Sequence, residues 1–450
     1  MRRIYEPAAY NVDVNSYWQT TTSPPRWPQL KEDRSAETVI IGSGYTGLNC
    51  ALELAERGHD PQSIVILEAN QPGWGASGRN GGFCCIGGTK LPVEKQLVRF
   101  GEAETVRYFK EQCASIESVR ENLKRYGIDV DTHSQGETQL AHREEDVAGL
   151  SAEKEQMKSL FNVDCELIEK PALSGEGLAS PEFHGALNMR LGFALNPMKY
   201  LAGLAQSADG AGIAGYGDSP AMAIERDGSY WKVSTPGGAV AAQNLVIATN
   251  GYSSEDLPRW LSGRLLPVLS NILLTRPLTA EEVAAQGWTS NQMCHDTRNL
   301  LHYFRLMPAA NGESGPRMLF GMRGGTTANE ATMAAMRQRI RADFERFFPA
   351  WRQVETPFFW AGLVCLNRNL VSHTGPIPGM TNAWASLAYH GSGVAMGSHC
   401  GRLLGKMIDG ALTPDAIPAI MRQPPRRFPF PALRRSYLAA AYRWHEWREH

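Results

Sequence analysis

The sequence predicts an α/β fold that begins with a Rossmann-type dinucleotide-binding unit over residues 37–69. Three observations support this prediction. The run "TVII" at 38–41 is almost continuously apolar, as is typical of a strand buried on both faces. A glycine-rich turn and an alanine- and leucine-rich helix over residues 45–57 follow, and Gly58 ends that helix. A second apolar strand, "SIVILEA" at 63–69, completes a βαβ unit.

The turn of this unit has the glycine spacing of a pyrophosphate site. Gly42 allows a tight turn, Gly44 lets the backbone approach the phosphates, and Gly47 allows the helix to pack closely on the strand. The N-terminus of the helix adds free N–H groups and the positive end of its dipole. We therefore expect the turn to contact a dinucleotide through Gly42, Ser43, Gly44, Tyr45, Thr46 and Gly47.

An acidic residue ends the second strand. In this motif a carboxylate at that position accepts the ribose hydroxyl groups, which favours a free 2′-OH and argues against NADP. Glu68 is expected to have this role, with Ala69 beside it. The alternative for Glu68 is a solvated charge at a strand end.

A second glycine-rich stretch favours FAD over NAD. The segment 73–83, "GWGASGRNGGF", has five glycines in eleven residues where an NAD enzyme would continue with further βα units. A loop with few side chains lets the backbone approach a planar ring closely, although a flexible surface loop would have a similar composition. We expect the flavin to contact this loop through Trp74, Gly75, Ala76, Ser77, Arg79, Asn80, Gly81 and Gly82.

The rest of the chain alternates between strands and helices, without an internal repeat. Residues 1–35 are rich in Pro, Thr and Trp and are expected to form an extended arm that packs through its aromatic residues. Helices are expected at 92–126, 197–206, 328–348 and 391–408, and strands at 230–235, 245–254, 302–308, 317–323 and 384–390.

Composition excludes several classes of protein. The chain has 450 residues, 43% hydrophobic and 20% charged, with a formal net charge of −1, so it has no electrostatic signature of nucleic-acid binding. No apolar stretch approaches the roughly 18 residues of a membrane span, and no secretory signal is recognised. The eight cysteines lack metal-ligand spacing. We expect reduced thiols, no metal and a cytoplasmic location.

Together, the motifs resemble those of the D-amino-acid-oxidase (DAO) superfamily of FAD-dependent amine oxidoreductases, and most resemble its gamma-glutamylputrescine oxidase-like branch. The resemblance covers residues 16–412 in the family's order. The matching stretches are "SYWQTT", "VIIGSGYTGLNCALELAERG", "GWGASGRNGGF", "LVIATNGYSS", "HYFRLMP", "MLFGMRGG", "WAGLV", "HTGPIPG" and "YHGSGVAMGSHCGRLLG".

The resemblance implies a Rossmann-type FAD-binding domain interleaved with an antiparallel-sheet substrate domain. It places Thr249, Asn250 and Gly251 near the pyrophosphate, and Gly391, Ser392, Gly393 and Val394 near the isoalloxazine. A helix N-terminus there would stabilise negative charge on reduced flavin. The implied divisions are an arm at 1–35, an FAD domain at 36–110, 165–255 and 360–412, a substrate domain at 111–164 and 256–359, and a tail at 413–450 that packs on the body.

Substrate contacts are expected on the strands of the second domain. Alternation places Tyr303 and Arg305 on one face of their strand. Arg305 and Arg323 could each bind a carboxylate through two hydrogen bonds, or form ion pairs at the sheet edge. His390 could hydrogen-bond the substrate amine or the flavin, or be structural. Our candidates for the catalytic site are Arg305, Arg323, His390 and Tyr303.

Cys365 is a candidate for covalent attachment of the flavin. In sarcosine-oxidase relatives a cysteine at a comparable place is joined to FAD. Here "LNRN" replaces the Thr-rich strand of those relatives. We therefore expect non-covalent FAD, with a buried free thiol at Cys365.

The resemblance implies oxidation of a C–N bond in an amine or amino acid. Hydride passes to flavin N5, the imine hydrolyses, and O2 becomes H2O2. A gamma-glutamylputrescine-like or other carboxylated amine is the candidate substrate. The alternatives are a dehydrogenase that reduces a quinone or a protein, a tailoring oxidase of a biosynthetic intermediate, and a flavoprotein that only binds. The basic, aromatic tail at 420–450 is expected to be a packed helix, and could instead dock on an anionic membrane or a partner.

Overall fold

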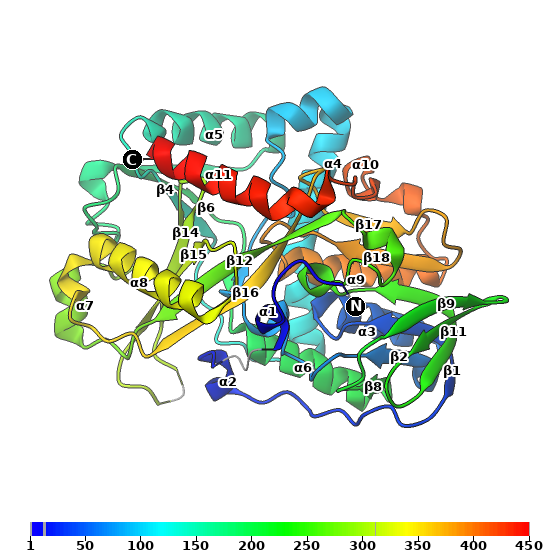
Figure 1. Ribbon diagram of the computed structural model, residues 1–450. Coiled ribbons are helices and arrows are strands. Elements are labelled where there is room, and N and C mark those ends of the chain that lie inside the picture. The colour runs from blue at the N-terminus through cyan, green and yellow to red at the C-terminus, as the bar shows by residue number, and fades with distance from the viewer. Residues whose placement is uncertain (1, 12–14, 311, 450) are drawn as a thin grey trace.

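Two eight-stranded sheets organise the protein, as the computed structural model shows (Figure 1). The structure describes residues 2–11, 15–310 and 312–449. The first sheet contains the dinucleotide-binding unit, and the second is largely antiparallel. The expected fold class, a Rossmann-type domain joined to an antiparallel-sheet domain, is confirmed.

The first sheet has a parallel centre. Its order is β17-β18-β11-β1-β2-β8, with β10 and β9 extending from β11. Strand β1 pairs in parallel with both β2 and β11, so its residues 38–41 are buried on both sides. The strands are β1 (Arg34–Ile41), β2 (Ile64–Leu67), β8 (Ala214–Tyr216), β9 (Ala223–Asp227), β10 (Tyr230–Ser234), β11 (Ala239–Ile247), β17 (His373–Pro376) and β18 (Ala383–Leu387).

Two helices pack closely beside this sheet because glycines line their contact. Helix α3 (Tyr45–Glu56) follows β1, and α9 (Ala395–Ile408) follows β18. A Cβ atom added at Gly401 of α9 would lie 2.4 Å from the carbonyl oxygen of Thr46, and one at Gly405 would lie 2.7 Å from the side chain of Glu53. The two helices can therefore approach only because these positions lack side chains.

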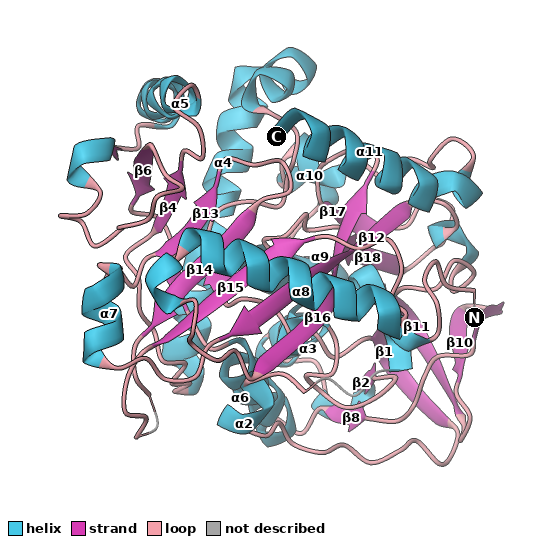
Figure 2. Cartoon of the chain, turned by 60° about the vertical axis from the view of Figure 1, so that its left-hand side comes forward, coloured by secondary structure: helices cyan, strands magenta, loops and turns pink. Residues whose placement is uncertain are grey.

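The second sheet has the order β16-β12-β15-β14-β13-β4-β6-β5. Helix α8 (Glu330–Phe347) lies across it (Figure 2) and buries Phe344 and Phe347 against Phe304 and Phe320 of the sheet. The strands are β4 (Glu137–Leu140), β5 (Cys165–Glu169), β6 (Gly185–Met189), β12 (Leu265–Leu274), β13 (Met293–Asp296), β14 (His302–Met307), β15 (Arg317–Arg323) and β16 (Phe358–Asn367). A separate pair joins β3 (Phe83–Cys84) to β7 (Phe193–Ala194).

The remaining helices surround the two sheets. Helix α4 bends at Gly101, whose φ of +80° is not helical. The last helix packs on the body through Leu438, which contacts Leu266 and Val268. No helix in the described ranges is long and apolar enough to cross a membrane. These helices are α1 (Ala8–Asn11), α2 (Trp18–Thr21), α4 (Val93–Tyr126), α5 (Asp146–Phe161), α6 (Pro197–Gly210), α7 (Ala280–Gln286), α10 (Ala419–Arg422) and α11 (Arg434–Glu449).

Two expected strands end earlier than the sequence indicated. Strand β11 ends at Ile247, before a 3-10 turn at Asn250–Tyr252, and β18 ends at Leu387. The φ angles of Asn250, Ala388 and His390 are +41°, +64° and +54°. Such left-handed residues turn the chain out of the sheet, and the turns bring both segments to the cavity described below.

The sheets divide the chain at positions other than the expected domain limits. Strands β5 and β6 fall in the segment 165–255, which was expected with the FAD domain, yet β6 pairs with β4 of the second sheet and β5 pairs with β6. Strand β16 crosses the expected limit at 360 and pairs with β12 over its full length. Sequence motifs do not mark these limits, because strand pairing over such separations is a tertiary event.

Candidate active site

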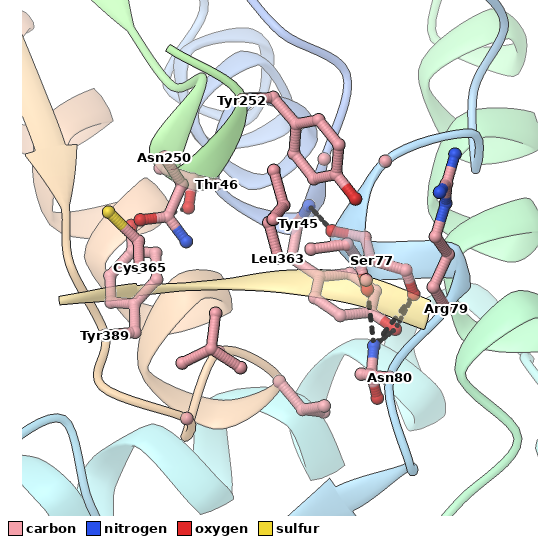
Figure 3. Close-up of a pocket in the computed structure, with 18 of the residues that line it drawn as sticks. Tyr45, Thr46, Ser77, Arg79, Asn80, Asn250, Tyr252, Leu363, Cys365 and Tyr389 are labelled. Carbon is pink, nitrogen blue, oxygen red and sulfur yellow. Dashed lines mark hydrogen bonds between the residues drawn. The ribbon is translucent and has the colours of Figure 1, made fainter. Parts of the chain in front are cut away.

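A cavity of about 520 Å³ is lined by residues of both sheets. The first sheet contributes the glycine turn and the carboxyl ends of β2 and β11, the usual position of a ligand in an open α/β sheet. The second sheet contributes residues of β12, β14, β15 and β16. Figure 3 shows Ser77 and Asn80 on one side of this cavity, and Cys365 and Tyr389 on the other.

Glu68 is fixed beside the glycine turn. The backbone N–H and the hydroxyl of Ser43 donate to Oε2 of Glu68 at 3.0 and 2.8 Å, and the N–H of Asn70 donates to Oε1 at 3.1 Å. The carboxylate lines the cavity with its position set by the backbone. A carboxylate has room for further donors, so hydroxyl groups of a ribose suit this position.

Two helices begin at the cavity, and in each the N-cap residue has no side chain that caps the helix. Helix α3 has Gly44 at its N-cap, and α9 has Val394. A Cβ at Gly44 would lie 2.9 Å from Oγ of Ser77, which itself accepts the N–H of Tyr45 at 3.1 Å. Uncapped helix N-termini present N–H groups and positive dipole ends, which bind anions. The arrangement suits a pyrophosphate at α3 and an electron-rich ring at α9.

The glycine-rich loop at 73–83 is held firmly in place. The amide of Asn80 donates to the carbonyl oxygens of Ala76 and Ser77 at 3.1 and 2.9 Å, and the indole N–H of Trp18 donates to the carbonyl oxygen of Asn80 at 2.9 Å. The guanidinium of Arg79 lies 4.5 Å from the centre of the Trp74 ring. The N-terminal arm thus helps to fix the loop through Trp18.

Several buried polar atoms at the cavity lack hydrogen-bond partners among the described residues. They are the hydroxyl of Tyr252, Nη2 of Arg79 and both ring nitrogens of His390. Buried polar groups are normally paired, so unpaired ones around a cavity indicate a polar ligand. With the two helix N-termini, Glu68 and the glycine turn, the residues present fit FAD.

Arg323 and Tyr303 line the other end of the cavity. Nη2 of Arg323 donates to the carbonyl oxygen of His390 at 3.2 Å, and the hydroxyl of Tyr303 lies 2.9 Å from Oγ of Ser270. Burial, followed by the positive charges of Arg323 and Lys90, lowers the pKa of His390 to about 3. The imidazole is therefore neutral at physiological pH.

Arg305 lies elsewhere, which corrects the expectation that it meets substrate. It is not among the residues that line the cavity. Its Nε donates to the carbonyl oxygen of Gly81 at 3.0 Å, its Nη2 to that of Leu195 at 2.9 Å, and its Nη1 to Nε2 of His133 at 2.9 Å. Tyr303 and Arg305 do share a strand face, but Arg305 binds the backbone of the glycine-rich loop and does not reach the cavity.

Three glycines expected at the cofactor also lie behind the cavity wall. A Cβ at Gly47 would lie 1.9 Å from the carbonyl oxygen of Gly42, and one at Gly82 would lie 2.0 Å from that of Leu195. Gly251 packs against Leu363, and a Cβ at Gly251 would lie 3.2 Å from Cβ of Leu363. These glycines shape the cavity by letting the backbone pack closely. The other expected cofactor residues line it.

Several charged or titratable residues that line the cavity were not expected from the sequence, among them Lys90, Glu137 and His295. Nε2 of His295 lies 4.0 Å from Oε2 of Glu137. The positive charge of Arg323, followed by burial, lowers the pKa of Lys90 to about 8, and burial raises that of Glu137. These residues come from three separate segments, and none belongs to a recognisable motif.

Cys365 also lines the cavity, on β16, and is 1% exposed. Its carbonyl oxygen accepts the N–H of His390 at 3.2 Å. Burial raises the pKa of its thiol. The protonated thiol is a weak nucleophile at neutral pH.

Comparison with known proteins shows which family the chain belongs to. The family model for DAO, described as FAD dependent oxidoreductase, matches residues 37–407. The chain is 28% identical over 407 residues to a probable oxidoreductase OrdL of Haemophilus influenzae, covering 89% of this chain and 90% of that protein. It is 28% identical over 382 residues to gamma-glutamylputrescine oxidoreductase of Escherichia coli, covering 85% of each.

The fold also matches solved structures. The crystal structure of glycine oxidase from Geobacillus kaustophilus superimposes with a TM-score of 0.66 at 21% identity, covering 84% of this chain and 95% of that one. The match to the family model extends from β1 through α9 and so includes both sheets. The protein belongs to the DAO family of FAD-dependent oxidoreductases.

Proposed function

We propose that the protein oxidises a C–N bond of an amine that also carries a carboxylate, and that O2 accepts the electrons. Overall, the amine, O2 and water give a carbonyl compound, a released amine or ammonia, and H2O2. The observation that carries this proposal is Arg323. It lines the cavity beside His390 and has no carboxylate within 4 Å among the described residues. A carboxylate of the substrate would complete its contacts.

FAD, when bound, supplies the acceptor for the hydride that leaves the carbon next to nitrogen. The turn at 42–46, Glu68 and the loop at 73–81 would hold its dinucleotide part and the near edge of its ring. The N-terminus of α9 would lie at the far edge of the ring, where it stabilises negative charge. In this proposal Cys365 makes no bond to the cofactor, because burial keeps its thiol protonated.

The cations of the cavity prepare the substrate. Arg323 and Lys90 would orient the carboxylate, and their positive charges lower the pKa of a nearby amine, as Arg323 does for Lys90. An amine held there is more readily neutral, which hydride removal requires. The neutral imidazole of His390 can accept a hydrogen bond from that amine. No strong side-chain base is needed.

The E. coli relative supports the proposed substrate class, because its name specifies gamma-glutamylputrescine, a primary amine with an amino-acid head group. The test is a panel of amines mixed anaerobically with the oxidised holoenzyme while flavin absorbance is followed. Carboxylated amines should reduce the flavin faster than neutral analogues of equal length. On admission of air, O2 uptake and H2O2 should match the amine consumed. A flavin that no amine reduces contradicts the proposal.

One observation favours a second candidate, a dehydrogenase that passes electrons to a quinone or a protein. Helix α11 exposes Tyr437, Trp444 and Trp447, which are 39%, 55% and 72% accessible. Exposed aromatic groups of this kind mark interaction surfaces. The rate at which the reduced enzyme reacts with O2, compared with a soluble quinone, separates the two candidates.

A further inference from the structure

Besides Arg323, the cavity is lined by two charged groups, Lys90 and Glu137, that have no close partner of opposite charge among the described residues. The ammonium group of Lys90 has no carboxylate within 4 Å among the described residues, although Lys90 and Glu137 both line the cavity. The only ion pair of Glu137 within the described ranges is that with His295, at the limiting distance of 4.0 Å.

The order of three of these charged groups follows from the strand order of the second sheet. Arg323 donates to the carbonyl oxygen of His390, next to the start of α9. The positive charge of Arg323 lowers the pKa of Lys90, and the negative charge of Glu137 raises it by less. Glu137 lies on β4, whose neighbour β13 carries His295. Going outward from β16, the order is therefore Arg323 on β15, His295 on β13 and Glu137 on β4, and Lys90 lines the same cavity from the loop after β3.

Separated opposite charges facing a cavity suit a zwitterion. A charged group that lines a cavity without a close partner in the protein favours a ligand that brings the opposite charge. A head group that carries an ammonium and a carboxylate on one carbon would give a partner to Glu137 and to Lys90 at once. A simple monoamine or a simple carboxylate would satisfy only one of them.

We propose that Glu137 selects substrates with a zwitterionic α-amino-acid head remote from the amine that is oxidised. Glu137 receives the ammonium group of the head, and Lys90 with Arg323 receives its carboxylate. The inference rests on the proposed function and deepens it, because it assigns the group that recognises the end of the substrate away from the flavin.

The test uses three probes that share a putrescine end. γ-Glutamylputrescine has the complete head, N-glutarylputrescine lacks only the ammonium group, and N-(4-aminobutanoyl)putrescine lacks only the carboxylate. Anaerobic flavin reduction by the holoenzyme gives the rate constant divided by Kd for each. In Glu137→Gln this ratio should fall about 10- to 100-fold for γ-glutamylputrescine, as expected for losing a hydrogen bond to a charged group, and hardly change for N-glutarylputrescine.

Three further variants sharpen the result. Lys90→Met should weaken both probes that have a carboxylate and spare N-(4-aminobutanoyl)putrescine. Glu153→Gln is the matched control, since Glu153 is an electrostatic neighbour of Glu137 and His295 but does not line the cavity. It should behave as the wild type with all three probes. Glu137→Asp, which keeps the charge, should restore part of the preference.

The outcomes separate the two proposals. If amines reduce the flavin but Glu137→Gln affects γ-glutamylputrescine and N-glutarylputrescine equally, the assignment of Glu137 is wrong and the proposed function stands. If no amine reduces the flavin, the proposed function fails. Binding is then followed by the change in the visible flavin spectrum, and equal weakening of both probes by Glu137→Gln overturns the inference as well.

Discussion

The guanidinium of Arg323 donates a hydrogen bond from Nη2 to the carbonyl oxygen of His390 at 3.2 Å. This contact joins the last residue of β15 to the left-handed turn that leads into α9. It fixes a cation at the place where the second sheet meets the expected position of the flavin ring. A Cβ added at Gly391 would lie 3.1 Å from Nη2 of Arg323, so a side chain there would crowd the guanidinium.

Arg323 and Arg305 should differ in what their removal changes. Arg323→Ala should lower kcat/KM about 100-fold or more on carboxylated amines and much less on neutral ones, because truncating one partner of a buried charge pair costs ~2–5 kcal/mol. Arg305→Ala should mainly lower Tm, because each backbone acceptor left unsatisfied costs about 1–3 kcal/mol. Stopped-flow flavin reduction and thermal unfolding measure the two effects. Equal losses of kcat/KM in both variants would contradict the placement of Arg305 behind the loop.

Retention of FAD should depend on Glu68 and Gly44. Glu68→Ala removes the acceptor that Ser43 and Asn70 position, and should weaken FAD binding by ~1.5–3 kcal/mol if the ribose hydroxyls bond to it. Gly44→Val places a side chain 2.9 Å from Oγ of Ser77 and should abolish retention. Flavin content after gel filtration, and reconstitution with added FAD, report both effects. Full retention by Gly44→Val would show that the turn does not approach the cofactor.

The flavin should be released by acid. Because burial raises the pKa of the Cys365 thiol, little thiolate is present to attack the flavin. After precipitation with trichloroacetic acid, all yellow colour should be in the supernatant, for the wild type and for Cys365→Ser alike. Colour that stays in the wild-type pellet and disappears in Cys365→Ser would instead identify Cys365 as an attachment site.

Binding of carboxylates should weaken as pH rises through the pKa of Lys90, which Arg323 and burial lower to about 8. Below that pH the ammonium is charged and attracts an anion, and above it the neutral amine does not. Kd for pentanoate, read from the visible flavin spectrum, should therefore rise above about pH 8 by at most about tenfold per pH unit, the limit for one proton. Lys90→Arg keeps its charge and should show a flatter profile between pH 7 and 9.5. Identical profiles in both proteins would assign the titration to another group.

The dinucleotide half of the site could be predicted from the sequence because its chemistry is local. The strand, the three glycines, the helix and Glu68 occupy 31 consecutive positions, 38–68, so their spacing alone defines the turn. The loop at 73–83 follows directly. The structure gathers most of these residues around one cavity, and places Gly47 and Gly82 just behind its wall, where only a residue without a Cβ fits.

The substrate half depended on contacts between distant segments. Alternation correctly placed Tyr303 and Arg305 on one face of β14, but it could not say how far along that face the cavity reaches. Trp18 and the Gly81–Gly82 backbone cover Arg305, and its guanidinium donates to two backbone carbonyl oxygens and to the ring of His133. Lys90, Glu137 and His295 line one cavity only because β4 pairs with β13 and because the segment after β3 folds over the same cavity. Local spacing determines a phosphate-binding turn, whereas the charges that face a substrate are decided by which distant strands pair.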